Sequence, residues 1–266
     1  MNKILVPVDF SDTSLNALKY AIELFGASIS EITLLHVYET RSTTMMIKNI
    51  DKLIEEDCRR EMKELIENVQ KTYPKAALKS KILKEYAVPA IVALGDSGDF
   101  DFIAMGTQGA SGLKEVFLGS VAGGVISKTS APVIVVPHGH TFQPLDEIVL
   151  ALSDVPLSNS EVIKPLRKIV AMHQCKVKVL HISEEKTDRI ENVPSEIKDL
   201  NPSVEYAFGS GDIHEDLNDY LVKNSSGLLC LIRGKKGFLE RIFKESVTLK
   251  QTFDSPVPLL ILHDSE

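Results

Sequence analysis

Residues 105–136 read MGTQGASGLKEVFLGSVAGGVISKTSAPVIVV, and this stretch decides the fold. It follows the apolar run Phe102–Met105, passes three glycines and reaches Gly119-Ser120 before an apolar helical pattern, and the apolar run Val133–Val136 closes it. Glycine lets a backbone approach a ligand closely and permits positive φ. We expect Ser120 to be the N-cap of the helix, whose unpaired N–H groups would attract an anion. The stretch therefore predicts a phosphate cradle between two buried strands.

The composition of the 266-residue chain argues against several classes of protein. A net charge of −7 argues against a surface that binds nucleic acid. No apolar run reaches the ~18 residues that span a bilayer, and Asp9 interrupts the first run too early for a signal peptide. Cys58, Cys175 and Cys230 are scattered and odd in number, which indicates a reducing compartment. We therefore expect a cytoplasmic protein that binds neither nucleic acid nor membrane.

The chain carries one pattern of apolar runs twice, which indicates an internal repeat. The matching pairs, in order, are Ile4–Asp9 with Ile148–Ser153, Leu34–Val37 with Val179–Ile182, Phe102–Gly106 with Leu229–Gly234, and Ala131–Val136 with Ser255–Leu262. A short polar stretch with Gly and Pro, residues 138–144, separates the two copies. We predict two tandem domains, residues 1–140 and 141–266.

Each copy alternates short apolar runs with longer helical patterns, which is typical of βαβ units and a parallel sheet covered by helices. In the first copy we expect helices from the N-cap candidates Ser11–Ser14 to Leu24, over 47–69 and over 88–94, with a strand at 78–83. The second copy is shorter between its second and third strands, so the helix at 47–69 has no full counterpart there. The predicted fold class is α/β, with two tandem doubly wound parallel sheets.

The spacing Gly106-x2-Gly109-x9-Gly119-Ser120 is similar to the nucleotide motif of the universal stress protein family. Ile4–Ser11 resembles the first strand of that family with its Asp, and Leu34–Val37 resembles its second strand. The resemblance covers residues 1 to about 138 and, with the repeat, points to the tandem form of the family. It implies Rossmann-like domains similar to those of the adenine nucleotide alpha hydrolases.

The strand ends also point to a ligand site. Asp9, Val37 and Gly106 each follow or end a predicted strand, and ligands bind at the carboxyl ends of the strands in doubly wound sheets. The resemblance implies that the backbone of Val37 meets adenine and that Asp9 lies near adenine and ribose. The family's ATP-binding pattern carries over onto Pro7, Asp9, Val37, Met105, Gly106, Gly109, Gly119, Ser120 and Val121, the last four as phosphate contacts through N–H groups and the Ser hydroxyl. ATP would bring Mg²⁺ bound to its phosphates.

The second copy departs from this motif. Ser153 stands where Asp9 would be, and Lys244-Glu245-Ser246 replaces Gly119-Ser120, although Gly234 and Gly237 keep the first glycine pair. An acidic, bulky residue in a phosphate cradle costs space and electrostatic attraction, so we expect the second domain to bind no ATP. Its small basic cluster is expected to be a solvated face, with contact to an anion or a partner as the alternative; the cluster consists of Arg233, Lys235, Lys236 and Arg241.

Several residues also have purely structural interpretations. Asp9 caps the turn at Ser11–Ser14 or contacts a ligand, and the sequence leaves both open. Gly123-Gly124 is expected to allow close helix packing, Gly112 to be a turn residue, and His138–His140 to be linker. The chain has no GxxxxGK[ST] motif, no GxGxxG after the first strand and no metal-ligand histidine spacing, and we assign no catalytic residues.

The leading hypothesis is a tandem universal stress protein that binds ATP in its first domain. Binding, or slow hydrolysis, would switch contacts with unknown protein partners during stress. The alternative is a nucleotide-independent scaffold of the same fold, and a third is an ATPase or transferase with Asp9 as its base. Single-domain members commonly dimerise through their last strand, so the resemblance implies that 133–136 and 259–262 pair within this chain as a pseudo-dimer. A homodimer of whole chains is left open.

Overall fold

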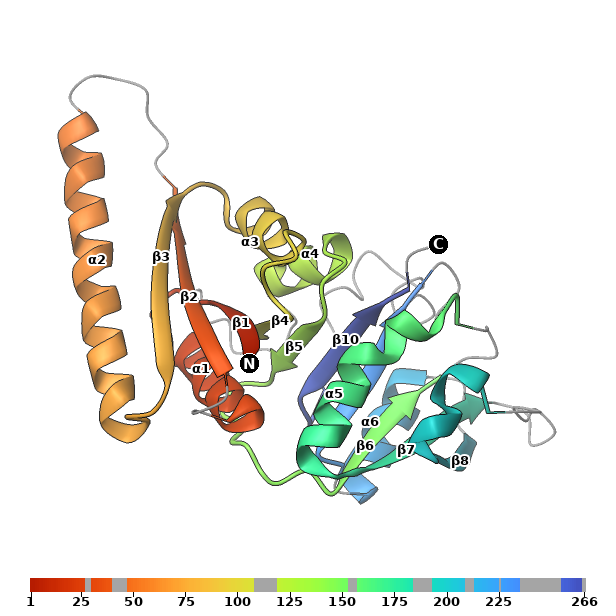
Figure 1. Ribbon diagram of the computed structural model, residues 1–266. Coiled ribbons are helices and arrows are strands. Elements are labelled where there is room, and N and C mark those ends of the chain that lie inside the picture. The colour runs from red at the N-terminus through yellow and green to blue at the C-terminus, as the bar shows by residue number, and fades with distance from the viewer. Residues whose placement is uncertain are drawn as a thin grey trace.

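The computed structural model describes residues 1–26, 30–39, 47–107, 119–152, 157–183, 193–208, 213–224, 226–234 and 255–264. Its strands form one sheet in the order β3-β2-β1-β4-β5-β10-β9-β6-β7-β8 (Figure 1). The strands of the first half are β1 (Asn2–Pro7), β2 (Ser30–Tyr38), β3 (Ala77–Lys84), β4 (Phe102–Gly106) and β5 (Val133–Val136). Those of the second half are β6 (Glu147–Ala151), β7 (Lys176–Ser183), β8 (Ser203–Phe208), β9 (Leu228–Arg233) and β10 (Leu259–His263).

The two halves of the sheet have the same topology. Within each half the strands run parallel, and the order β3-β2-β1-β4-β5 is repeated as β8-β7-β6-β9-β10. β1 lies between β2 and β4, so the chain builds outward first in one direction and then in the other, as in doubly wound sheets. This confirms the predicted fold class, whereas the boundary at residue 140 stays a prediction.

β5 and β10 join the halves as an antiparallel pair, with Ile134 opposite Leu260. All four residues of β5 are buried, so neither half presents this apolar strand as an open edge. The pairing predicted for 133–136 and 259–262 is therefore confirmed.

Helices cover both faces of the sheet, and their bounds are α1 (Asp12–Phe25), α2 (Ile47–Thr72), α3 (Ala87–Gly95), α4 (Ser120–Lys128), α5 (Lys164–His173) and α6 (Ile213–Asn224), with the short 3-10 helix η1 (Ser160–Ile163) before α5. Ser11 is the N-cap of α1, as expected, because its Oγ accepts from the N–H of Ser14. Figure 1 shows α2 standing beside the edge strand β3. Between β7 and β8 the described residues form only the 3-10 helix η2 (Ser195–Leu200), and there is no counterpart of α2 among them.

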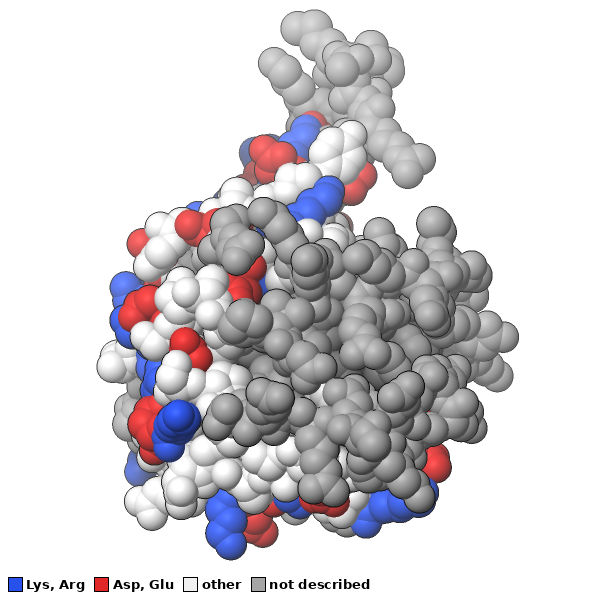
Figure 2. Space-filling model, turned by 90° about the vertical axis from the view of Figure 1, so that its right-hand side faces the viewer, with Lys and Arg blue, Asp and Glu red and all other residues white. Residues whose placement is uncertain are grey.

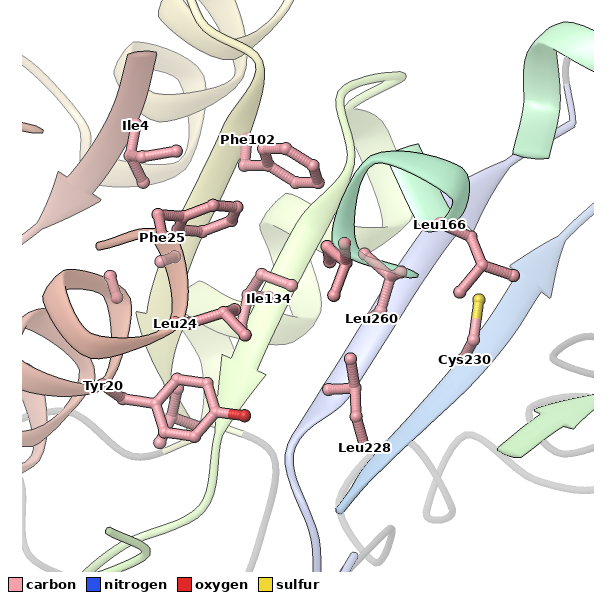
Figure 3. Packing of buried hydrophobic residues seen from close by; sticks show 14 of the residues in the cluster. Ile4, Tyr20, Leu24, Phe25, Phe102, Ile134, Leu166, Leu228, Cys230 and Leu260 are labelled. Atoms are coloured by element: carbon pink, nitrogen blue, oxygen red, sulfur yellow. The ribbon is translucent and has the colours of Figure 1, made fainter. Parts of the chain in front are cut away.

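Two hydrophobic cores lie on opposite faces of the sheet because successive strand residues point to opposite sides. α1, α2 and α5 cover the core that contains Ile4, and α3, α4 and α6 cover the one that contains Leu5. In Figure 3, side chains of α1 point toward β4 and β5, and the ring of Phe25 lies 4.7 Å from that of Phe102. Leu166 of α5 lies over Cys230 in the same view. Both cores run through both halves of the chain.

The segment 137–146, which connects the halves, has no helix or strand and lies against α1. Asn16 Nδ2 donates to the carbonyl oxygens of Pro137 (3.3 Å) and His140 (3.1 Å). The ring of Tyr20 lies 6.1 Å from that of His140. The expectation that 138–140 is linker is confirmed.

Charges of both signs lie next to one another on the described part of the surface. Figure 2 shows lysine and arginine side chains next to aspartate and glutamate in the described part of one face. On α2, for example, Arg59 pairs with Glu55 and Lys52 with Glu56. In the described ranges, no helix is both long and apolar enough to span a membrane.

Candidate functional site

A cavity of about 270 Å³ opens at the carboxyl ends of β1, β2 and β4, where the strand order of the first half reverses. Its size is near the lower end of the range usual for small-molecule sites. The lining residues come from three strand ends and three helices and are Pro7, Val8, Asp9, Ser14, Leu35, Val37, Ala87, Ile91, Met105, Gly106, Thr107, Gly119, Ser120, Val121 and Ala122.

The turn after β1 places Asp9 at the cavity and ties it to α1. Asp9 Oδ1 accepts from the N–H of Ser11 (3.2 Å) and from its hydroxyl (2.5 Å). The N–H of Asp9 donates to Ser14 Oγ at 3.4 Å. Asp9 therefore caps the turn and lines the cavity, so the two interpretations left open by the sequence do not exclude each other.

The same turn contains a backbone conformation that is uncommon for a side-chain-bearing residue. Phe10 has φ of 63°, in the left-handed region. Its ring lies 4.4 Å from that of His36, whose Nδ1 is 2.8 Å from the carbonyl oxygen of Val8. These contacts hold the turn in place, and they give His36 a structural role.

The backbone of Val37 faces the cavity because β1 ends before it reaches the position opposite Val37. Pro7 is the last residue of β1 and lies opposite Leu35, and the N–H of Val8 donates to the Leu35 carbonyl at 2.8 Å. Backbone groups of alternate strand residues point the same way. The N–H and C=O of Val37 therefore point to the β1 side, where the strand has given way to the cavity.

Gly106 packs more closely than a ligand site alone would require. A Cβ at this position would lie 2.5 Å from Thr13 Cγ2 and 3.0 Å from the Thr13 carbonyl oxygen. Gly106 does not have a positive φ. The expectation that this glycine serves ligand approach or positive φ is therefore incomplete: its missing side chain makes room for the first turn of α1.

The first turn of α4 forms one end of the cavity. The N-cap is Gly119, with φ −55° and ψ 154°, and Ser120 is the first helical residue. The prediction that Ser120 is the N-cap is therefore wrong, because the extended backbone that precedes the helix falls one residue earlier. N–H groups in a first helical turn have no acceptor within the helix. The N–H groups of Ser120, Val121 and Ala122 belong to this first turn, and all three residues line the cavity.

Thr107 is a lining residue that the sequence did not single out. It is 9% exposed, and its Oγ1 has no hydrogen-bond partner among the residues that the structure describes. Leaving a buried hydroxyl unpaired costs about 1–3 kcal/mol, so a polar partner is expected here. Its place between Gly106 and Gly109 of the motif was the one feature of the sequence that could have pointed to it. The carbonyl oxygen of Thr107 accepts from the N–H of Gly119, which ties β4 to α4.

The cavity is lined by both apolar and polar groups. Side chains from β2, α3 and β4 form an apolar wall and belong to Leu35, Val37, Ala87, Ile91 and Met105, and Pro7, Val8, Val121 and Ala122 also line the cavity. Asp9 is the one ionisable side chain among the described lining residues. An anionic group in this cavity would therefore rely on backbone N–H groups and hydroxyls.

Eight of the nine site residues that the resemblance implied line this cavity; they are Pro7, Asp9, Val37, Met105, Gly106, Gly119, Ser120 and Val121. Gly109 and the turn residue Gly112 lie outside the described residues, so those predictions remain. Gly124 packs closely as expected, since a Cβ there would lie 2.8 Å from Val88 Cγ2 of α3.

The register of the strands aligns the two halves differently from the sequence comparison. Ile4 of β1 lies opposite Phe102 of β4, and its counterpart Ile148 of β6 lies opposite Leu228 of β9. Phe102 therefore corresponds to Leu228. The prediction that Gly234 takes the place of the first motif glycine is wrong, because the sequence comparison aligned glycines and not sheet positions.

In the corrected register, Ile232 corresponds to Gly106 and Arg233 to Thr107. The end of β9 thus lacks both of those residues. Arg233 is half-buried and its Nη1 donates to the carbonyl oxygen of Ile126 in α4. The expectation of a solvated face is therefore wrong for Arg233. Ser153, Lys235, Lys236, Gly237, Arg241 and Lys244–Ser246 lie outside the described residues.

Comparison with known proteins gives consistent matches. The model of the universal stress protein family matches residues 1–137. A universal stress protein of Methanocaldococcus jannaschii is 33% identical over 151 residues, which cover 50% of this chain and 93% of that protein. One of Bacillus subtilis is 30% identical over 145 residues, covering 51% and 98%. The crystal structure of a universal stress protein from Archaeoglobus fulgidus shares the fold over 99% of both chains, with a TM-score of 0.67 and 20% identity.

Proposed function

The chain belongs to the universal stress protein family, and on this premise we propose that its first half, residues 1–140, binds ATP in the cavity at the ends of β1, β2 and β4. The second half, residues 141–266, binds no nucleotide in this proposal. ATP acts as a regulatory ligand that changes contacts with partner proteins in the stress response.

The observation that carries this proposal is the polar end of the cavity. The buried hydroxyl of Thr107 lacks a partner among the described residues and lines the same cavity as the first turn of α4. A helix N-terminus attracts phosphate through its N–H groups and its dipole. The apolar wall of the same cavity suits a flat base. One cavity thus offers complementary surfaces to both ends of a nucleotide.

The proposed roles follow this division. The backbone N–H and C=O of Val37 pair with adenine, Asp9 lies at the ribose, and Gly119, Ser120 and Val121 hold the phosphates together with Gly109. The described residues contain no group of three His, Cys, Asp or Glu that could hold a metal ion. In this proposal Mg²⁺ arrives with the phosphates, which is its usual mode of binding.

A regulatory role fits the chemistry of Asp9. Its carboxylate accepts two hydrogen bonds from Ser11 and fixes the turn after β1. A group held in this way positions the site, and the proposal includes hydrolysis that is slow at most.

We propose the cytoplasm as the compartment, since Cys58, Cys175 and Cys230 are all free thiols. A homodimer of whole chains stays a prediction.

Thr107→Val tests the proposal because valine keeps the shape of threonine and removes the hydroxyl. We expect Mg-ATP to bind about five- to tenfold more weakly, as the loss of one hydrogen bond of ~1 kcal/mol requires. The unfolding free energy of the nucleotide-free variant should stay equal or rise, because an unpaired buried hydroxyl disappears. Calorimetric titration and urea unfolding measure the two quantities.

Thr107→Ser is the matched control, since it keeps the hydroxyl and should bind within about twofold of the wild type. Equal affinity of a folded Thr107→Val variant would contradict the role of this end of the cavity. Absence of any Mg-ATP binding to the folded wild type would favour the nucleotide-independent scaffold.

A further inference from the structure

Arg233, the counterpart of Thr107, makes a contact with the other half of the chain. It ends β9 in the second half, and its Nη1 donates to the carbonyl oxygen of Ile126 in α4, which belongs to the first half. Its strand end is anchored, since the N–H of Asp264 donates to the Arg233 carbonyl at 2.7 Å and Asp264 accepts from the N–H of Ser158 at 2.9 Å.

The Ile126 carbonyl needs a donor from outside its helix. It lies in the last turn of α4, where carbonyl groups have no partner within the helix. Ser130, four residues on, directs its N–H to Asp96 Oδ1 at 2.8 Å instead. The guanidinium of Arg233 meets this carbonyl, and a cation at a helix C-terminus also interacts favourably with the helix dipole.

The other end of the same helix faces the cavity. α4 spans nine residues from Ser120 to Lys128, and its first turn lines the site. Gly124, near its middle, packs against Val88 of α3 in the first half. α4 is thus held by its own half at its middle, through Val88, and just past its C-terminal end, through Asp96, while Arg233 of the other half binds a carbonyl group of its last turn. A shift at the C-terminal end would turn the first-turn N–H groups away from the cavity.

We propose that Arg233 is a positioning residue for α4, through which the second half of the chain raises the affinity of the first half for the phosphate groups of a nucleotide. This inference rests on the proposed function. It gives the second half a role in binding although it holds no nucleotide itself. Because the contact is to α4 and not to the apolar wall, its effect is confined to the phosphates.

The test compares Mg-ATP with adenosine, which lacks phosphates, as ligands of the full chain. Arg233→Met keeps the length of the side chain and removes the guanidinium. We expect Mg-ATP to bind about five- to tenfold more weakly to this variant, within the usual size of coupling between sites, while adenosine affinity stays within about twofold. Arg233→Lys, which keeps a cation, should lose less.

Lys128→Met is the matched control, because Lys128 is also a cation in the last turn of α4 but is exposed. It should leave both affinities within about twofold, which separates the contact with Ile126 from charge at the helix end. Unchanged Mg-ATP affinity in Arg233→Met, or equal losses for Mg-ATP and adenosine, would overturn the inference and leave the proposed function standing. A folded wild-type chain that binds neither ligand would overturn both.

Discussion

At Gly106 the backbone lies between the cavity and the first turn of α1. Gly106→Ala would bring a Cβ within 2.5 Å of Thr13 Cγ2, closer than real Cβ contacts. We expect this substitution to lower the unfolding free energy by about 2 kcal/mol, as overpacking does. Urea unfolding of the nucleotide-free chain measures the loss.

Thr13→Ser supplies the second arm of a double-mutant cycle, since it removes Cγ2 and keeps the hydroxyl that lies 3.1 Å from His138 Nδ1. In this background Gly106→Ala should cost less, but still something, because the Thr13 carbonyl oxygen would lie 3.0 Å from the new Cβ. Strictly additive effects would contradict the packing explanation.

The site residues that could be predicted from the sequence are those that belong to a recognisable spacing motif. Glycine and serine spacing, with the resemblance that it supports, is enough to indicate Gly106, Gly119 and Ser120. It passes over Thr107, because a spacing motif treats intervening positions as interchangeable. Its place between two motif glycines was the one sequence signal, and what distinguishes Thr107 is its burial and the missing partner of its hydroxyl, both of which depend on the folded chain.

At the scale of elements, Asp96 joins the end of α3 to the end of α4. Its Oδ1 accepts from Thr129 Oγ1 (2.7 Å), from the N–H (2.8 Å) and hydroxyl (2.9 Å) of Ser130, and from the N–H of Ala131 (3.2 Å). Partial loss of solvation acts to raise the pKa of Asp96, but these hydrogen bonds outweigh it and hold the pKa below its ordinary value of 3.8.

This lowered pKa makes part of the stability depend on pH. Because the folded pKa lies below the unfolded one, the stabilisation is complete above the ordinary value and is lost as the pH falls through the folded value. Asp96→Asn should cost about 0.5–1 kcal/mol at neutral pH, a small effect since the side chain is exposed. Urea unfolding from pH 7 to pH 3 should show the gap between variant and wild type closing below about pH 4.

Asp99→Asn, at an exposed carboxylate in the same loop, is the control and should leave the unfolding free energy at pH 7 within about 0.5 kcal/mol of the wild type. A constant difference between Asp96→Asn and the wild type over the whole pH range would contradict the explanation.

Periodicity predicted most elements, but not the details at their ends. α1, α2, α3 and β3 lie where the apolar patterns placed them, within a few residues. The start of α4 was one residue out, because serine and glycine both occur at N-caps and the choice depends on backbone angles. The register of β9 was wrong because a repeated glycine was a weaker guide than hydrogen bonding between strands.

At the scale of the whole molecule, one sheet and two cores run through both halves. We therefore expect the chain to unfold in a single cooperative transition. Leu166→Ala, which empties a fully buried position in α5, should cost about 2–5 kcal/mol and shift that transition as a whole. Scanning calorimetry measures the number of transitions, and hydrogen exchange at β1 reports the effect on the distant half.

Two separate transitions, or faster exchange confined to the second half in Leu166→Ala, would contradict this view of the molecule. The repeat was predictable from apolar runs, and the pairing of β5 with β10 was an implication of the family resemblance. The contact of Arg233 with α4 was not, because no pattern along the chain relates a residue in one half to a carbonyl group in the other.

The measurement to make first is a calorimetric titration of Mg-ATP into the full chain, with Gly119→Glu beside the wild type. The proposed function predicts micromolar binding at one site per chain and its loss in Gly119→Glu, since a carboxylate would face the phosphates at the start of α4. Ser127→Glu, which adds the same charge near the other end of α4, should retain binding. A stoichiometry near two, or unchanged binding in Gly119→Glu, would contradict the proposal.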